Sequence, residues 1–178
     1  MRTLTLFLAL WLVALLPGAV GAQEALQPQA PPETGAWTLA PGFTPDPLRV
    51  PALIGGGDID AVHRQLGADC AGFITAEPDV RLTLEQPMPL LNLAFVADAL
   101  TTDTTLVVYA PDGTFHCNNN HSPGLFNPMV TLNPALAGDY AIWVGGFTPE
   151  VPVYGELFVT TRADAQPGST GLVLPVAT

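Results

Sequence analysis

The sequence predicts an all-β protein, an antiparallel β-sandwich of jelly-roll type with about eight or nine strands. Short apolar runs, many of them alternating with polar residues, recur every 8–12 residues with turn signals between them. No segment shows the period of an amphipathic helix over three turns. Only 12% of the residues are charged, while 19 are Pro and 17 are Gly, which argues against a helical bundle.

The strands are expected one after another along the middle of the chain. The clearest alternates Val80, Leu82 and Leu84 with polar residues, the period of a strand with one buried face. The sequence Pro111-Asp112-Gly113 predicts a tight hairpin turn between two neighbouring strands. The expected strands span residues 59–65, 70–75, 80–84, 90–97, 104–110, 114–118, 128–132, 140–145 and 154–160.

Residues 1–22 have the pattern of a secretory signal peptide. Arg2 precedes an apolar run over residues 4–16, and Val20-Gly21-Ala22 supplies the small residues that signal peptidase requires. The alternative is a membrane anchor, but this run of 13 residues falls short of the roughly 20 that span a bilayer. We therefore expect cleavage after Ala22, no membrane insertion of the mature chain, and a periplasmic or extracellular location.

The rest of the chain divides into a leader, one domain and a tail. Residues 23–47 are rich in Pro, Gln and Ala and are expected to form an extended linker. Residues 48–162 are expected to form the β-sandwich, and residues 163–178 a C-terminal tail. Trp37 and Phe43 interrupt the polar leader, so they either dock on the domain or offer a surface for binding.

The charge of the chain excludes some partners. Sixteen acidic residues face only five basic ones, which gives a net charge of −11. A protein that binds nucleic acid or anionic lipid needs basic residues to neutralise phosphates. We therefore expect no nucleic-acid partner.

Cys70 and Cys117 are the only cysteines. In an exported chain two cysteines predict one disulfide, with two buried free thiols as the alternative. A catalytic cysteine is not expected, because the oxidising compartment would cap its thiol.

The order of several short motifs resembles that of the bacterial pre-peptidase C-terminal domain family over residues 41–161. This resemblance implies a non-catalytic, jelly-roll-like β-sandwich of the kind often attached to secreted peptidases, with relatives that bind Ca²⁺ or extracellular polymers. The motifs that carry it are Pro41-Gly42-Phe43-Thr44-Pro45-Asp46-Pro47, Gly55-Gly56-Gly57, Cys70-Ala71-Gly72-Phe73-Ile74, Pro78-Asp79, Asp103-Thr104-Thr105-Leu106-Val107-Val108, Pro111-Asp112-Gly113, Cys117-Asn118-Asn119-Asn120, Asn127-Pro128, Gly138-Asp139-Tyr140 and Ile142-Trp143-Val144-Gly145.

One departure from the family bears on cation binding. Its members often have acids after Cys-Asn, where this chain has Asn119 and Asn120. Affinity for Ca²⁺ rises with the number of carboxylate ligands, so we expect at most a weak Ca²⁺ site and no other cofactor. The candidate ligands are Asp103, Asp112, Asn118, Asn119 and Asn120; the alternative is that the three asparagines only shape a turn.

Two classes of function follow. We expect a non-catalytic module that binds an extracellular or periplasmic polymer, a surface or a partner protein such as a secreted peptidase. The alternative is a small hydrolase or metal-dependent enzyme that uses His116 and His121. The chain has only two serines, Ser122 and Ser169, and neither lies in a nucleophile-elbow pattern, which disfavours a serine hydrolase.

Overall fold

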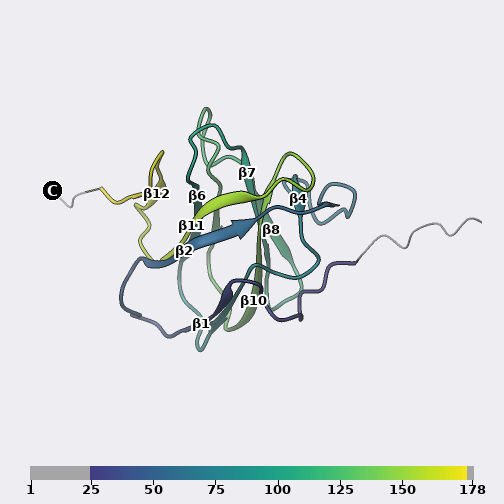
Figure 1. The fold of residues 1–178 in the computed structure, drawn as a ribbon. Coiled ribbons are helices and arrows are strands. Elements are labelled where there is room, and N and C mark those ends of the chain that lie inside the picture. Colours follow the sequence, from purple (N-terminus) through teal and green to yellow (C-terminus); the bar gives the residue numbers. More distant parts are fainter. Residues whose placement is uncertain (1–24, 176–178) are drawn as a thin grey trace, which may run out of the picture.

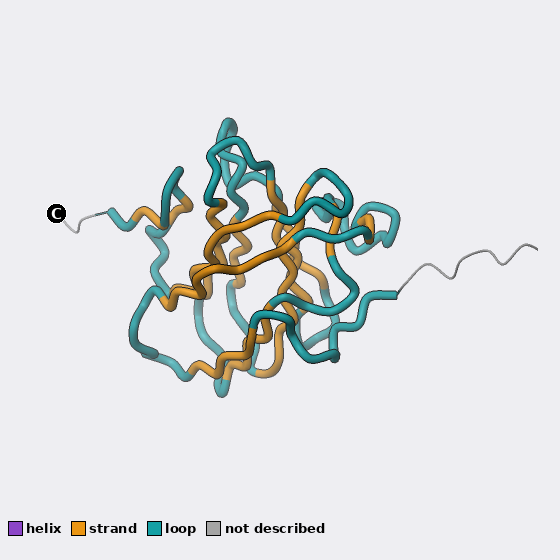
Figure 2. The backbone as a smooth tube through the Cα atoms, viewed as in Figure 1, coloured by secondary structure: helices purple, strands orange, loops and turns teal. Residues whose placement is uncertain are grey.

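The computed structural model describes residues 25–175, and the predicted signal peptide at residues 1–22 lies outside them. The described chain consists of strands, turns and loops without a helix, so it has no helix that could cross a membrane (Figure 2). Its strands form two larger sheets and a small C-terminal hairpin (Figure 1). The prediction of an all-β sandwich is confirmed, and the thirteen strands exceed the eight or nine expected.

The first sheet, sheet A, has seven strands around the long strand β10. One edge of β10 pairs with β5 and then β4, and its other edge pairs with β7. Its pairs are antiparallel except for the parallel pair β1–β5, so the predicted antiparallel sandwich contains one parallel pair. The strands are β1 (Gly35–Leu39), β3 (Ile59–Asp60), β4 (Phe73–Ile74), β5 (Val80–Leu84), β7 (Thr104–Tyr109), β8 (Phe115–Asn118) and β10 (Gly138–Gly146).

The second sheet, sheet B, has four strands in the antiparallel order β2-β11-β6-β9. In Figure 1 its strands β2 and β11 run side by side across the front of the molecule. The strands are β2 (Leu48–Gly55), β6 (Leu91–Ala97), β9 (Met129–Leu132) and β11 (Val153–Thr160). The C-terminal hairpin consists of β12 (Gln166–Pro167) and β13 (Leu172–Val173).

The main core lies between sheets A and B. The alternating residues of β5 that the sequence singled out, Val80, Leu82 and Leu84, are all buried in it. Tyr140 is also buried, and its hydroxyl donates a 2.8 Å hydrogen bond to the carbonyl oxygen of Leu136 four residues earlier. This bond satisfies the one polar group of a large core side chain and fixes the turn that leads into β10.

The segment predicted to be a linker is part of the sandwich. Its strand β1 lies along β5, and Trp37 and Phe43 pack against the main core. Earlier in the segment, the guanidinium of Arg81 donates 2.7 Å hydrogen bonds to the carbonyl oxygens of Pro28 and Ala30. The composition of residues 23–47 favoured a linker, because the segment has few apolar residues. It is ordered through contacts with β5, and no local pattern in the segment indicates those contacts.

Two further differences from the predicted strands have local causes. Strand β2 was not predicted, because Pro51 and Ala52, the latter at φ 54°, interrupt its alternation. The strand expected over residues 59–65 ends at Asp60, whose carboxylate accepts a 2.9 Å hydrogen bond from the backbone N–H of Val62. A side-chain acceptor at this position favours a turn over a continued strand.

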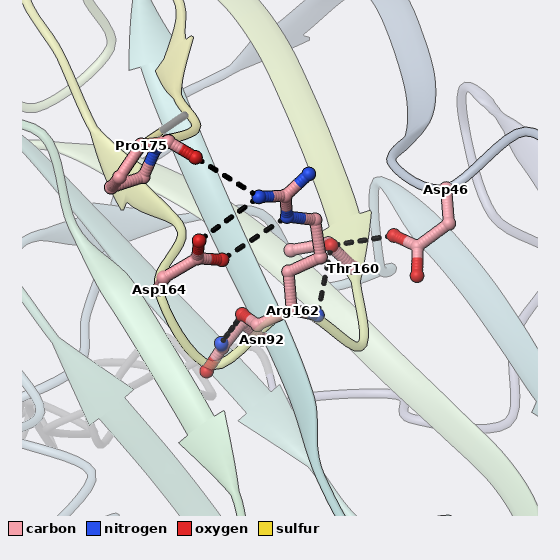
Figure 3. Close-up of polar contacts among 6 residues, drawn as sticks. All are labelled: Asp46, Asn92, Thr160, Arg162, Asp164 and Pro175. Carbon is pink, nitrogen blue, oxygen red and sulfur yellow. Dashed lines mark hydrogen bonds and ion pairs between the residues drawn. The ribbon is translucent and has the colours of Figure 1, made fainter. Parts of the chain in front are cut away.

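One end of the sandwich carries a polar network that we call the Asp46 clamp, formed by Asp46, Thr160, Thr161 and Arg162. Figure 3 shows Asp46, Thr160 and Arg162 of this network. One carboxylate oxygen of Asp46 accepts from the hydroxyl of Thr160, and the other accepts from the hydroxyl and the backbone N–H of Thr161. The guanidinium of Arg162 pairs with Asp164, and its backbone carbonyl accepts from the side chain of Asn92 in β6. The clamp thus joins the leader, sheet B and the C-terminal segment.

Candidate functional site

The opposite end of β11 carries the candidate site, which we call the loop end and define as residues 98–103 and 146–153. These residues connect β6 to β7 and β10 to β11. The backbone N–H of Asp98 donates 2.9 Å to the carbonyl of Tyr154, and that of Glu150 donates 2.8 Å to the carbonyl of Gly57. Both loops are therefore fixed to neighbouring backbone rather than extending freely into solvent.

The Gly55-Gly56-Gly57 motif lies at the end of β2 and contacts the 146–153 loop of the loop end. Gly56 has φ 100°, and a Cβ placed there would lie 2.6 Å from the carbonyl oxygen of Val151. Only glycine allows both this backbone conformation and this approach. The motif therefore positions the 146–153 loop against the sheets.

A pocket of about 310 Å³ lies between the two loops. Apolar side chains, threonine hydroxyls and one carboxyl group line it, and that carboxyl belongs to Asp103. The lining residues are Thr101, Thr102, Asp103, Gly146, Phe147, Thr148, Val151, Pro152 and Val153.

Asp103 is half-buried and lacks compensation for its charge. Its oxygen Oδ1 is shielded from solvent and has no hydrogen-bond partner. Burial raises the pKa of this carboxyl above its ordinary value, because removal from water disfavours the charged form. Most buried polar groups in folded proteins are hydrogen-bonded, so the unpaired Oδ1 is unusual, and Asp103 is the one acidic residue that lines the pocket.

Large apolar side chains stand exposed around the pocket. Leu100 is 64% exposed, Val151 48% and Phe147 41%. At the same end of sheet B, Ile54 and Tyr154 lie opposite each other across β2 and β11, and both are more than half exposed. Exposed apolar side chains that gather at one place mark interaction surfaces more often than scattered ones do.

The five candidate Ca²⁺ ligands do not come together. Asp103 precedes β7 and Asp112 follows it, so roughly 20 Å of strand separates them. The carboxylate of Asp112 accepts from the hydroxyl and N–H of Thr114, which lowers the pKa of Asp112 and shapes the hairpin turn. Asn118 lies at the Asp103 end of β7, opposite Leu106, and its side-chain oxygen accepts a 3.0 Å hydrogen bond from the N–H of Met129.

The rest of the asparagine run has structural contacts. The side-chain amide of Asn118 donates a 3.3 Å hydrogen bond to the carbonyl oxygen of Asn120. The side-chain amide of Asn120 donates to the carbonyl oxygens of Asn119 and Leu125. These bonds hold the loop that leaves β8. They match the alternative in which the asparagines shape a turn.

His116 and His121 have separate contacts in the described structure. His116 lies within β8, where its Nε2 is 3.1 Å from the hydroxyl of Thr114. His121 lies beyond the end of β8, and its backbone N–H donates 3.2 Å to the carbonyl of Asn127. Residues 25–175 contain no group of three or more His, Cys, Asp or Glu side chains arranged for a metal ion.

The predicted disulfide is confirmed. Cys70 and Cys117 are bonded, with their Cα atoms 4.9 Å apart, and the described chain has no free cysteine. The bond fixes the segment before β4 to strand β8. It lies beside a second, smaller apolar cluster that contains Ile74, Val107 and Trp143.

Trp37 and Phe43, the two aromatic candidates for binding, dock on the domain instead. Trp37 and Phe43 are partly buried and pack on the main core. Three of the exposed large apolar residues, Leu100, Phe147 and Val151, lie instead in loops that the strand pattern leaves unassigned. The sequence contained a signal for these three residues. A large apolar residue in a short segment between two strands has no expected place in the core, so it is a candidate for an exposed binding surface.

Comparison with known proteins adds no relative: no family model, no curated protein and no solved structure matches this chain. The resemblance to the pre-peptidase C-terminal domain therefore stays a prediction from sequence motifs.

Proposed function

We propose that this protein is an exported, non-catalytic binding module whose loop end docks an extracellular or periplasmic partner. The observation that carries the proposal is the pocket of about 310 Å³ surrounded by Leu100, Phe147 and Val151, which are all substantially exposed. Loops held at one end of a rigid β-sandwich commonly carry binding functions.

The covalent structure supports export. A disulfide between Cys70 and Cys117 persists in the periplasm or outside the cell and is rare in the cytosol. The signal-peptide pattern over residues 1–22 supports the same location. The motif resemblance adds the class of partner, an extracellular polymer, a surface or a protein such as a secreted peptidase.

The test is a binding panel with the exported, disulfide-bonded protein immobilised through its C-terminus. The panel contains cellulose, chitin, peptidoglycan, collagen and purified secreted peptidases. The double variant Leu100→Ser/Phe147→Ser removes the exposed apolar groups of the loop end. Its matched control, Val62→Ser/Val173→Ser, makes the same type of change at two other exposed apolar positions.

We expect at least one panel member to bind the parent and the Val62→Ser/Val173→Ser control but not the Leu100→Ser/Phe147→Ser variant. Equal binding by all three proteins would contradict it. A hydrolase panel with and without chelator runs in parallel, and turnover that is lost on His116→Ala or His121→Ala would favour the enzyme instead.

A further inference from the structure

The chemistry of the loop-end pocket is specific in one respect. Among its lining residues Asp103 is the only one with a titratable side chain, and the others are threonine, glycine, proline, valine and phenylalanine. A ligand that enters therefore meets one carboxylate within otherwise neutral surroundings. An amine or guanidinium group complements that carboxylate best.

The protein itself supplies no cation there. The chain has no lysine, and no arginine of residues 25–175 lines the pocket. Arg49 pairs with Glu156, Arg162 pairs with Asp164, and Arg81 binds the carbonyl oxygens of the leader. The carboxylate of Asp103 is thus kept in a partly shielded pocket without an internal counter-charge.

Resting on the proposed function, we infer that the pocket binds a Lys or Arg side chain of a polypeptide partner, with the carboxylate of Asp103 pairing to its charged head. The long apolar stem of such a side chain suits a pocket lined by Phe147 and Val151. The apolar residues that flank the basic residue in the partner pack on Leu100 and the exposed part of Phe147.

Other occupants fit less well. A second copy of this chain would bring two molecules of net charge −11 together, which their mutual repulsion disfavours. A polysaccharide would stack on Phe147, but it would gain little from covering the aliphatic side chains of Leu100 and Val151. A polypeptide with one basic and several apolar residues uses both features of the site.

The experiment measures fluorescence-anisotropy binding of labelled heptapeptides to the exported protein. The first peptide set has a central lysine flanked by leucine and phenylalanine. Matched sets replace the lysine by norleucine, which keeps the stem without the charge, or by glutamate. N-acetyl-lysine methylamide, tested by competition, represents a free amine without flanking residues.

The variant Asp103→Asn removes the charge with little change of shape, and Glu85→Gln is its control, because Glu85 is an exposed carboxylate beyond β5. We expect the lysine peptides to bind at least about tenfold tighter than the norleucine peptides. Asp103→Asn should abolish that difference, whereas Glu85→Gln should leave affinity within about twofold.

Three results would overturn the inference. Equal affinity of the lysine, norleucine and glutamate peptides would show that charge is not read, and absence of binding by any lysine peptide would exclude such a partner. Binding of N-acetyl-lysine methylamide as tightly as the peptides would indicate a free amine as ligand. The variant Leu100→Ser/Phe147→Ser distinguishes this inference from the proposed function. If the parent shows no preference for lysine but this variant loses peptide binding, the cation is wrong and the proposed function stands, whereas a variant that binds every peptide like the parent contradicts the proposed function.

Discussion

The two ends of the sandwich treat a half-buried carboxylate in opposite ways. At one end both oxygens of Asp46 accept hydrogen bonds from Thr160 and Thr161. At the other end Oδ1 of Asp103 is shielded and accepts none. A satisfied buried network rigidifies a fold, whereas an unsatisfied group costs stability and is retained where it has another role. The comparison indicates a stabilising role for the Asp46 clamp and supports the binding role that we propose for the loop end.

Removal of the clamp carboxylate should have the largest effect. Asp46→Ala leaves the buried hydroxyl of Thr160 without its acceptor and deletes three hydrogen bonds. We expect the free energy of unfolding to fall by about 3 kcal/mol, measured by urea denaturation at neutral pH. Asp46→Asn, which keeps an acceptor, should lose less, and an equal loss on the exposed Glu85→Ala would show that the clamp has no special weight.

Asp79 is a third carboxyl group of this kind: its Oδ1 also lacks a hydrogen-bond partner, but its side chain is completely buried. Its Oδ2 accepts a 2.6 Å hydrogen bond from the N–H of Val144, filling the gap in the β10 ladder between β5 and β4. Burial raises the pKa of Asp79 well above its ordinary value, and the negative charge of Glu33 raises it further. This carboxyl is thus a structural acceptor that no ligand reaches.

The raised pKa of Asp79 makes the stability of the protein depend on pH. The folded state binds the Asp79 proton more tightly than the unfolded state, so this residue's contribution to stability falls as pH rises from about 4 through the raised pKa. Asp79→Asn keeps an acceptor for Val144 and should flatten this part of the profile in urea denaturation at pH 4.5, 6 and 7.5. A parallel profile for the variant and the parent would mean that Asp79 is ionised in the folded protein.

Removing the charge of Asp103 at the loop end should slightly raise the free energy of unfolding, whereas removing Asp46 at the clamp should lower it. Asp103→Asn relieves a desolvated carboxylate whose pKa burial raises, so unfolding at neutral pH should cost slightly more energy than in the parent. The gain should stay below about 1 kcal/mol, since solvent screens much of this charge. A loss of stability comparable to that of Asp46→Ala in thermal and urea unfolding would remove the distinction between the two ends.

The smallest effect concerns Ca²⁺. We expect a shift in melting temperature only at millimolar Ca²⁺, the range of weak extracellular sites. Because Asp112 lies at the far end of β7 from Asp103, Asp112→Asn should leave the shift unchanged. Asn119→Asp/Asn120→Asp should enlarge the shift if the asparagine loop is a cation site, and no response of this variant would show that the loop is only a turn. A large drop in melting temperature on adding chelator to the parent protein would show a stronger site than this geometry supports.

Local pattern predicted most of the central strands but not the peripheral ones. Val80, Leu82 and Leu84 are buried as their alternation indicates, and the hairpin at Pro111-Asp112-Gly113 joins β7 to β8. Strand β1 was not predicted, because its partner is β5, about 45 residues away, and the leader around it has no period of its own. Long-range pairing of this kind leaves little trace in local composition.

The candidate site shows the same limit. Asp103 was a candidate residue, but for Ca²⁺ together with Asp112, which the register of β7 places at the other end of the strand. Phe147 and Thr148 meet Asp103 only because β10 and β7 are neighbours in sheet A. Residue type identified one member of the pocket, and topology supplied the others.

The pKa of Asp103 itself tests the central claim most directly. It is measured from the ¹³C shift of the Asp103 carboxyl during pH titration of the disulfide-bonded protein, alone and with saturating lysine or norleucine heptapeptide. We expect the pKa of Asp103 to lie above the ordinary aspartate value in the free protein and to fall on adding the lysine peptide, because a nearby cation favours the charged carboxylate. An unchanged pKa with bound lysine peptide, or the same change with norleucine peptide, would contradict the claim that the loop end holds this carboxylate for a basic partner.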